Sequence, residues 1–312
     1  MTIGIDMMGG DYAPLETVKG VQQFLSENND VNLLLIGDIS RLDKLLIEHN
    51  INSDNANVVH AEQVIGMHEH PTKALKEKKQ SSIAIGFHLL ASGKMDAFIS
   101  AGNTGAMLVG ALFSIKALDG VIRPTISTVI PKENGETGLL LDAGLNADCK
   151  PEHLNQFAIM GSVFAQQIFG INDPKVGLIN VGEEEGKGNL LAQAAYPLLK
   201  NNSHINFIGN IEGRDIFMEK ADVMICEGFT GNVILKLAES IYEITQRKKI
   251  EHEYFERFNF ENYGGTPVLG VSKPVIIGHG ISHAKAFKNM IRVACKMIEK
   301  DVLGKMKEEL IS

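Results

Sequence analysis

The sequence lacks the features of a membrane-spanning, secreted or general nucleic-acid-binding protein. No run approaches the ~18 consecutive apolar residues that a spanning helix needs. The first ten residues, MTIGIDMMGG, lack the basic region and long apolar core of a secretory signal. Its 38 acidic and 30 basic residues give a net charge of −8, whereas general nucleic-acid binding requires a basic surface. We expect a cytoplasmic protein that does not bind nucleic acid, with peripheral contact to a membrane left open.

Cysteine is scarce and is not arranged for metal binding or disulfides. Cys149, Cys226 and Cys295 are far apart in the sequence and form no CxxC pair. An odd number of widely spaced cysteines indicates a reducing compartment and argues against a structural zinc site.

Common motifs for nucleotide binding, metal binding and covalent catalysis are also missing. Gly182–Gly188, GEEEGKG, is one residue too short for a Walker A loop, and Gly188 stands where that loop has Ser or Thr. No GxGxxG follows the first expected strand, and no GxSxG supplies a serine nucleophile. His68–His70 and the pair His279 and His283 lack further ligands at suitable spacing. We expect no cofactor, no metal and no covalent nucleophile.

The remaining pattern is that of an α/β protein. The 312 residues are 44% hydrophobic and 22% charged, which suits a globular protein with a large core. Short apolar runs ending in Gly or a polar residue alternate with segments of helical spacing, which predicts a Rossmann-like layered sheet with helices on both faces. We expect a single catalytic domain spanning residues 1–312. The expected strands are 2–5, 31–36, 58–59, 97–99, 176–181, 205–208, 223–226 and 275–277; the expected helices are 14–26, 41–49, 71–79, 81–91, one from 106, 151–169, 189–199, one from 232, and 282–300.

One hairpin interrupts this alternation. Asn134-Gly135 lies between the apolar segments 125–130 and 139–141, and this dipeptide is a strong signal for a two-residue β-turn. The hairpin forms either an arm, which can serve a dimer, or a plain extension of the sheet.

The stretch Asp96–Gly110, DAFISAGNTGAMLVG, predicts a buried strand, a glycine-bearing turn and a helix. Ligands of open α/β sheets bind beyond the carboxyl ends of the strands. A turn that opens a helix there offers free backbone N–H groups and the positive end of the helix dipole. Ser100, Asn103 and Thr104 would line the same mouth. We expect an anion to bind here; the alternative is that the glycines only form a tight turn.

Basic residues recur at intervals of three and four near the C-terminus. Lys285, Lys288, Arg292 and Lys296 would form one stripe on the last expected helix. On an acidic protein this stripe predicts a dock for an acidic partner, and the alternative is a solvated helix face. A second candidate dock is the group Lys73, Lys76 and Lys79.

Eight segments carry a resemblance to a known family. They are Asp6–Asp11 (DMMGGD), Ser100–Ala106 (SAGNTGA), Asp142–Leu154 (DAGLNADCKPEHL), Asn180–Asn189 (NVGEEEGKGN), Gly209–Asp215 (GNIEGRD), Gly228–Lys236 (GFTGNVILK), Tyr263–Gly265 and His279–Gly280. In this order they resemble the PlsX family, the bacterial acyl-carrier-protein:phosphate acyltransferases of phospholipid synthesis.

The resemblance implies an activity and an assembly. A long-chain acyl group would pass from the thioester of acyl carrier protein to inorganic phosphate, and the acyl phosphate would go to a membrane glycerol-3-phosphate acyltransferase for phosphatidic acid synthesis. It also implies a homodimer and a fold similar to phosphotransacetylase and the isocitrate-dehydrogenase group. Family members have a helical excursion at about 232–262 that is implicated in dimer and membrane contact. Here the segment between Lys236 and Tyr263 is shorter, and Glu227 replaces the usual Asp.

The chemistry of this reaction suggests roles for the matching residues. Phosphate is itself the nucleophile and a thiolate leaves easily, so the site must mainly position phosphate and polarise the thioester carbonyl. We expect the turn at 102–105 with Lys187 to cradle phosphate, Thr230 and Asn232 to hold the oxyanion, and Asp142, Asn146 and His279 to face the thiol. The catalytic candidates are Asn103, Lys187, Thr230, Asn232 and His279. The substrate-binding candidates are Asp6, Gly10, Ser100, Gly102, Thr104, Gly105, Asp142, Asn146, Asn180, Glu184 and Asn210.

Two other functions compete with the acyltransferase. One is a nicotinamide-dependent dehydrogenase on a related fold, although the fingerprint glycines are missing. The other is a non-catalytic sensor that binds acyl carrier protein without releasing a thiol.

Overall fold

The computed structural model describes residues 1–28, 30–51 and 54–311. The chain divides into two compact units. The first unit comprises Met1–Ala117 and Glu261–Glu299, and the second comprises Leu118–Phe260 and Lys300–Ser312. Each unit combines a sheet with helices, in agreement with the expected α/β class, whereas the single catalytic domain stays a prediction.

The sheet of the first unit has the strand order β3-β2-β1-β4-β11-β10. The neighbouring strands run parallel except for β10, which is antiparallel to β11. The carboxyl ends of β1, β4 and β11 therefore share one edge. The strands are β1 (Thr2–Asp6), β2 (Asn32–Gly37), β3 (Ala56–His60), β4 (Ala97–Ser100), β10 (Thr266–Leu269) and β11 (Val275–Ile277).

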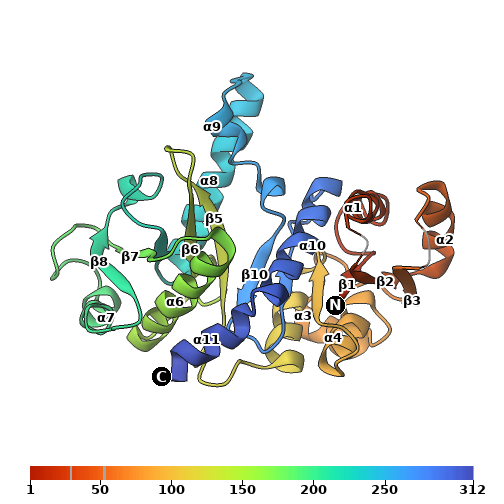
Figure 1. Ribbon diagram of the computed structural model, residues 1–312, viewed down its shortest axis with the longest axis horizontal. Helices are drawn as coiled ribbons and strands as arrows, with labels where there is room; N and C mark the ends of the chain where they lie inside the picture. The colour runs from red at the N-terminus through yellow and green to blue at the C-terminus, as the bar shows by residue number, and fades with distance from the viewer. Residues whose placement is uncertain (29, 52–53, 312) are drawn as a thin grey trace. The chain divides into compact units, whose positions relative to one another are not determined.

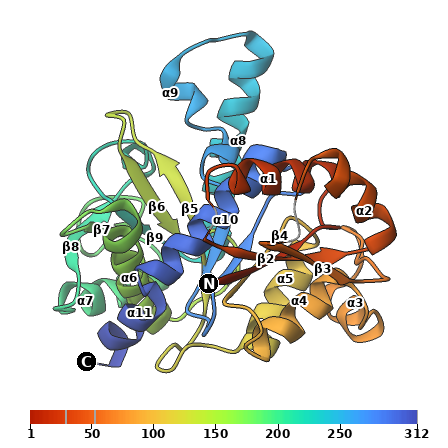
Figure 2. The same cartoon turned by 45° about the vertical axis from the view of Figure 1, so that its right-hand side comes forward.

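Helices cover both faces of this sheet, with α1 and α2 on one face and α3, α4 and α5 on the other (Figure 2). Helix α10 buries Phe287, Met290, Ile291 and Ala294, a spacing that forms one apolar face. It packs closely on α1 because Gly20 has no side chain; a Cβ there would lie 2.5 Å from Phe287 Cβ. The helices are α1 (Leu15–Leu25), α2 (Ile39–Glu48), α3 (Pro71–Glu77), α4 (Ser82–Ala91), α5 (Thr104–Gly110) and α10 (Ala284–Glu299).

The sheet of the second unit has the strand order β5-β6-β9-β7-β8. The expected hairpin is confirmed: β5 and β6 are antiparallel with Ser127 opposite Leu141, and Gly135 in the turn has φ +91°. The other pairs are parallel. The strands are β5 (Thr125–Pro131), β6 (Thr137–Leu141), β7 (Lys175–Ile179), β8 (Asn206–Ile211) and β9 (Val223–Ile225).

Helices also cover both faces of the second sheet. In Figure 1, α6 lies in front of the strands and the start of α8 lies behind them. Helix α6 also packs against α7 and α11. Among the described residues, none of the helices has the length and apolar character to span a bilayer. The helices are α6 (Pro151–Phe164), α7 (Leu190–Lys200), α8 (Gly228–Lys248), α9 (Glu253–Glu256) and α11 (Val302–Ile311).

Several elements differ from their expected bounds. The helix expected from residue 232 begins at Gly228, because the Glu227 carboxylate accepts the N–H of Thr230 at 2.9 Å and caps the helix earlier. Strand β10 and helix α11 were not expected. Pro267 interrupts the strand pattern of β10, and α11 buries only Val302 and Met306.

Candidate active site

The predicted site residues fall into two groups, one in each unit. Each group follows the carboxyl ends of parallel strands, where α/β proteins bind ligands. The first group contains Asp6, Gly10, Ser100, Gly102, Asn103, Thr104, Gly105 and His279. The second contains Asp142, Asn146, Asn180, Glu184, Lys187, Asn210, Thr230 and Asn232.

In the first unit, Asp6 anchors the turn that follows β4. Its carboxylate is fully buried and accepts the Ser100 hydroxyl at 2.6 Å and the Met8 N–H at 3.0 Å. The Ser100 hydroxyl in turn accepts the N–H of Gly102 at 2.9 Å. Burial raises the pKa of Asp6, and these hydrogen bonds oppose the rise. Asp6 and Ser100 therefore shape the turn from beneath.

The loop after β1 lies directly against this turn. A Cβ at Gly9 would be 2.4 Å from Asp6 Oδ2 and 2.6 Å from the backbone nitrogen of Gly102. Such distances leave room for glycine alone. Asp6–Asp11 and Ser100–Ala106 are two separate motifs in the sequence, and the fold brings them into contact.

Asn103 caps α5 and also holds a neighbouring loop. Its Oδ1 accepts the N–H of Ala106 at 2.9 Å, and its Nδ2 donates to the carbonyl oxygens of Gly66 at 2.9 Å and Glu69 at 3.0 Å. The side chain is 4% exposed. This arrangement makes Asn103 a positioning residue, and direct contact with phosphate stays a prediction. The sequence did not reveal the loop at 66–69 as its partner.

Thr104 and Gly105 form the first turn of α5. The first N–H groups of a helix have no intrahelical acceptor, so these two backbone groups are available to an anion. Thr104 is exposed. Gly105 packs against α3, where a Cβ would lie 2.3 Å from Cγ of Pro71.

The loop after β11 completes this group. Gly278 donates its N–H to the Ser100 carbonyl at 2.8 Å, and Asp11 donates its N–H to the Gly280 carbonyl at 2.8 Å. His279 lies between these two contacts. The loops after β1, β4 and β11 thus meet at one edge of the first sheet, which brings His279 beside the turn after β4 in the first unit, whereas Asp142 and Asn146, with which the sequence grouped it, belong to the second unit.

The basic stripe lies on α10, away from the buried face of that helix. Lys285, Arg292 and Lys296 are exposed. Glu27 forms ion pairs with Arg292 and, at 2.9 Å, with Lys288, and the hydrogen bond from Lys288 lowers the pKa of Glu27. Lys285 donates to Asn262 Oδ1 at 2.5 Å. Three of the four cations therefore have a partner within the described chain, and docking stays a prediction.

In the second unit, the Asp142 carboxylate organises the loop after β6. It is fully buried and accepts backbone N–H groups from Gly144 at 3.1 Å, Leu145 at 3.0 Å and Asn146 at 2.7 Å. The side-chain amide of Asn146 also donates to it at 2.7 Å and to the Pro124 carbonyl at 2.9 Å. Both predicted residues thus hold the loop in place.

The start of α8 presses against this loop. Gly228 donates its N–H to the Asn146 carbonyl at 2.7 Å, and a Cβ at Gly231 would lie only 1.8 Å from the Asp142 carbonyl oxygen. Asn232 is exposed beside Gly144. The structure therefore brings Asp142, Asn146 and Asn232 together.

Thr230 is bound by Glu227. The Thr230 hydroxyl donates to Glu227 Oε1 at 2.5 Å, and the same carboxylate caps the helix at the Thr230 N–H. Because its hydrogen is directed to Glu227, this hydroxyl faces its surroundings as an acceptor. Stabilisation of an oxyanion by Thr230 stays a prediction. Glu227, which stands where the family usually has Asp, is therefore the residue that holds Thr230 in place.

Two buried or half-buried asparagines brace the loop at 182–188. Asn180 donates its amide to the Lys187 carbonyl at 3.0 Å, and Asn210 donates to the Glu184 carbonyl at 2.9 Å. The side chains of Glu184 and Lys187 are exposed. The loop therefore has a fixed backbone and presents Lys187 outward.

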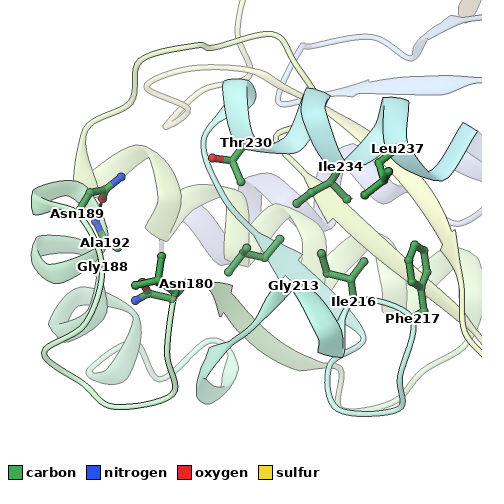
Figure 3. A pocket seen from close by; sticks show the side chains of 12 residues that line it. Asn180, Gly188, Asn189, Ala192, Gly213, Ile216, Phe217, Thr230, Ile234 and Leu237 are labelled. Carbon is green, nitrogen blue, oxygen red and sulfur yellow. Dashed lines mark hydrogen bonds between the residues drawn. The ribbon is translucent and has the colours of Figure 1, made fainter. Parts of the chain in front are cut away.

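A pocket of about 540 Å³ opens beside these residues (Figure 3). Thr230, Ile234 and Leu237 of α8 form one wall, and Ile216 and Phe217 lie across from them. The sequence motifs did not point to these apolar residues, because apolar residues at helical spacing are typical of any buried helix face.

Known proteins share both the sequence and the fold. A family model described as "Fatty acid synthesis protein" matches residues 1–305. The "Phosphate acyltransferase" of Dictyoglomus turgidum is 44% identical over 330 aligned positions, which cover 99% of this chain and 98% of the relative. The chain belongs to the phosphate acyltransferase family. It is an acyltransferase, and this assignment replaces the dehydrogenase and sensor alternatives.

A second relative supports the same assignment. The "Phosphate acyltransferase" of Pelotomaculum thermopropionicum is 44% identical, and the alignment covers 100% of this chain and 96% of the relative. The Dictyoglomus alignment spans 330 positions whereas this chain has 312 residues. That relative therefore has residues that this chain lacks, and their place between Lys236 and Tyr263 stays a prediction.

Solved structures confirm the expected fold. A phosphotransacetylase from Streptococcus pyogenes matches with a TM-score of 0.67 at 18% identity, covering 96% of this chain and 94% of the other. A branched-chain phosphotransacylase from Enterococcus faecalis V583 matches with a TM-score of 0.61 at 15% identity, covering 96% and 99%. At these identities the likeness concerns the fold alone.

Proposed function

We propose that this protein transfers a fatty acyl group from acyl carrier protein to inorganic phosphate, giving acyl phosphate for phosphatidic acid synthesis. The observation that carries the proposal is the 44% identity to a phosphate acyltransferase over 99% of the chain. The hydrogen-bonded loops after β1, β4 and β11 add support, because they leave the first backbone N–H groups of α5 available to an anion.

In this reaction a phosphate oxygen attacks the thioester carbonyl carbon. The carbonyl becomes an oxyanion, and the carbon–sulfur bond then breaks to release the thiolate of the carrier. Preorganised donors accelerate such a step by stabilising the developing charge. We assign phosphate binding to the backbone N–H groups of Thr104 and Gly105, and Gly102, whose N–H is bonded to Ser100, shapes the turn beside them. Assistance from Lys187 and oxyanion binding by the start of α8 stay predictions.

The remaining roles follow the chemistry of each group. Asp6, Gly10, Ser100 and Asn103 position the phosphate-binding turn. Asn180, Glu184 and Asn210 shape the loop that presents Lys187. Asn232 supplies an exposed amide for the oxyanion, and Asp142 and Asn146 position the loop beside it. Action of His279 at the thiol end stays a prediction.

The proposal includes partners and an assembly. Acyl carrier protein docks on the stripe formed by Lys285, Lys288, Arg292 and Lys296, and the product passes to a membrane glycerol-3-phosphate acyltransferase. The protein works in the cytoplasm as a homodimer with peripheral membrane contact. The helical excursion at about 232–262 serves the dimer and membrane contacts. The reaction uses no metal and no cofactor.

The test is release of thiol from palmitoyl-acyl carrier protein, followed with and without added phosphate. We expect release that depends on phosphate, is unchanged by EDTA and yields acyl phosphate, which is detected as label transferred from radioactive phosphate into the lipid extract. Sulfate at matched ionic strength is the control. Binding of the carrier without thiol release, or release that is equal without phosphate, contradicts the proposal.

A further inference from the structure

The pocket beside α8 is built as an apolar groove with a polar end. Thr230, Ile234 and Leu237 follow one another at intervals of four and three residues and therefore lie on one face of the helix. At a rise of ~1.5 Å per residue this wall is about 10 Å long. Ile216 and Phe217 form the opposite wall along the same direction (Figure 3).

Polar side chains gather at one end of the groove. Figure 3 shows Asn180 and Asn189 grouped toward the Thr230 end, whereas Leu237 and Phe217 lie at the other. None of the twelve lining residues carries a charged side chain. Small-molecule sites are typically apolar cavities with a few polar groups that set the orientation. The groove therefore suits an uncharged chain with one polar end and disfavours a multiply charged ligand such as a nucleotide.

Apolar side chains at the edges of the groove are exposed to water. Val181 is 81% exposed and Leu237 is 61% exposed. Ile216, by contrast, is 5% exposed and belongs to a core cluster that also contains Met224, against which Ile234 and Phe217 pack. The groove thus has a firm floor and an apolar rim that a ligand would cover.

We propose that this groove binds the alkyl chain of the acyl substrate. The chain lies between α8 and the segment 216–217 and enters the groove past Asn180 and Thr230, so that the thioester carbonyl lies outside the polar end of the groove. The inference rests on the proposed function, because it takes a fatty acyl group as the substrate. It adds a binding site for the part of the substrate that does not react.

The size of the groove determines how strongly it can bind an alkyl chain. Its volume of about 540 Å³ falls within the ~300–1,000 Å³ typical of ligand sites. Each methylene removed from water contributes roughly fourfold to affinity. A substitution that excludes two methylenes therefore weakens binding by more than tenfold, and a donor too short to reach the groove is unaffected.

Ala192→Phe tests the proposal, with Ala194→Phe as its matched control. Ala192 lines the groove on α7 and is 8% exposed, whereas Ala194 lies two positions along the same helix and is exposed. We expect Ala192→Phe to lower kcat/KM for palmitoyl-acyl carrier protein at least tenfold and to leave the butyryl donor nearly unchanged. Ala194→Phe should change neither. Equal effects on both donors, or normal palmitoyl turnover in a folded Ala192→Phe protein, overturn the proposal.

A second variant and a binding measurement complete the test. Gly213 also lines the groove, and a Cβ there meets no atom within 4 Å, so Gly213→Leu narrows the groove should Ala192→Phe fail to fold. Binding of laurate is measured by calorimetry without any turnover. We expect both groove variants to weaken it at least tenfold, and unweakened laurate binding contradicts the inference. Absence of phosphate-dependent thiol release in the unaltered protein contradicts the proposed function instead.

Discussion

Polar side chains in the segments that carry the family resemblance mostly hold the backbone in place. Asp6 and Ser100 fix the turn after β4, and Asp142 collects four hydrogen-bond donors from its own loop. Asn103 is bonded at both ends of its amide. Catalysis by preorganised donors needs this rigidity, because small displacements of the reacting groups cost rate.

Asn103→Ala is expected to weaken both the fold and the activity. Loss of the helix cap costs ~1 kcal/mol, and loss of the hydrogen bonds to the half-buried 66–69 loop costs ~0.5–1.5 kcal/mol. The free energy of unfolding should fall by about 1.5–2.5 kcal/mol in urea titrations. Because α5 then loses its fixed start, phosphate-dependent turnover should fall by roughly tenfold or more.

Asn103→Asp separates the two functions of this side chain. It keeps the oxygen that caps Ala106 and loses the amide that donates to Gly66 and Glu69. Turnover close to normal in the Asp variant would assign the effect to the cap alone. Unchanged stability of Asn103→Ala would contradict the positioning role.

At the scale of elements, the ends of helices and strands carry the site. Helix α8 begins where Glu227 caps Thr230, and its first turn lies against the loop after β6. Helix α10 contributes an exposed basic surface and no residue of the site itself. Its buried face packs on α1 and the sheet, which leaves the basic stripe outward.

The basic stripe should govern the affinity for acyl carrier protein. Lys285→Glu combined with Lys296→Glu reverses two exposed charges of the stripe and spares Lys288 and Arg292, which are paired with Glu27. Charge reversal at a docking rim slows encounter, so the apparent KM for the acylated carrier should rise several-fold, and less so at high salt. Lys94→Glu, on an exposed turn, is the matched control. If the double variant and Lys94→Glu raise the apparent KM equally, acyl carrier protein docks on another surface.

At the scale of the whole molecule, paired carboxylates link stability to pH. Hydrogen bonds from Lys288, Lys78 and Lys307 lower the pKa values of Glu27, Glu69 and Asp119, respectively. A lowered pKa in the folded state contributes stability above the unfolded value and loses it as pH falls through the folded value. Burial raises the pKa of Asp6, which contributes in the opposite sense, since that stability is lost as pH rises.

Three paired carboxyl groups have a lowered pKa and Asp6 has a raised one, so the protein should lose stability in acid. The free energy of unfolding should begin to decrease as the pH falls below about 6.5, the ordinary value for histidine, because burial lowers the pKa of His153 in the folded state. It should decrease further below about 4.5, the ordinary value for glutamate, as the paired carboxylates take up protons. Denaturant titrations at neutral and acidic pH measure this. Glu27→Gln should reduce the loss, and stability that increases on acidification would contradict the expectation.

The sequence by itself determined the α/β class, the hairpin at Asn134-Gly135 and the family. These depend on local periodicity, a turn dipeptide and ordered short motifs, all of which are properties of neighbouring residues. The same information placed the site candidates after strand ends, and it located Ser100, Asp142 and Asn180 in the segments where the structure has them.

Only the tertiary structure decided what those residues contact. Asn103 binds a loop more than thirty positions away, and Asp6 binds a serine 94 positions away. The groove combines residues from Ile179 to Leu237 that have no common motif. Contacts of this kind arise from the packing of distant segments, and packing depends on the whole chain because long-range burial overrides local preference.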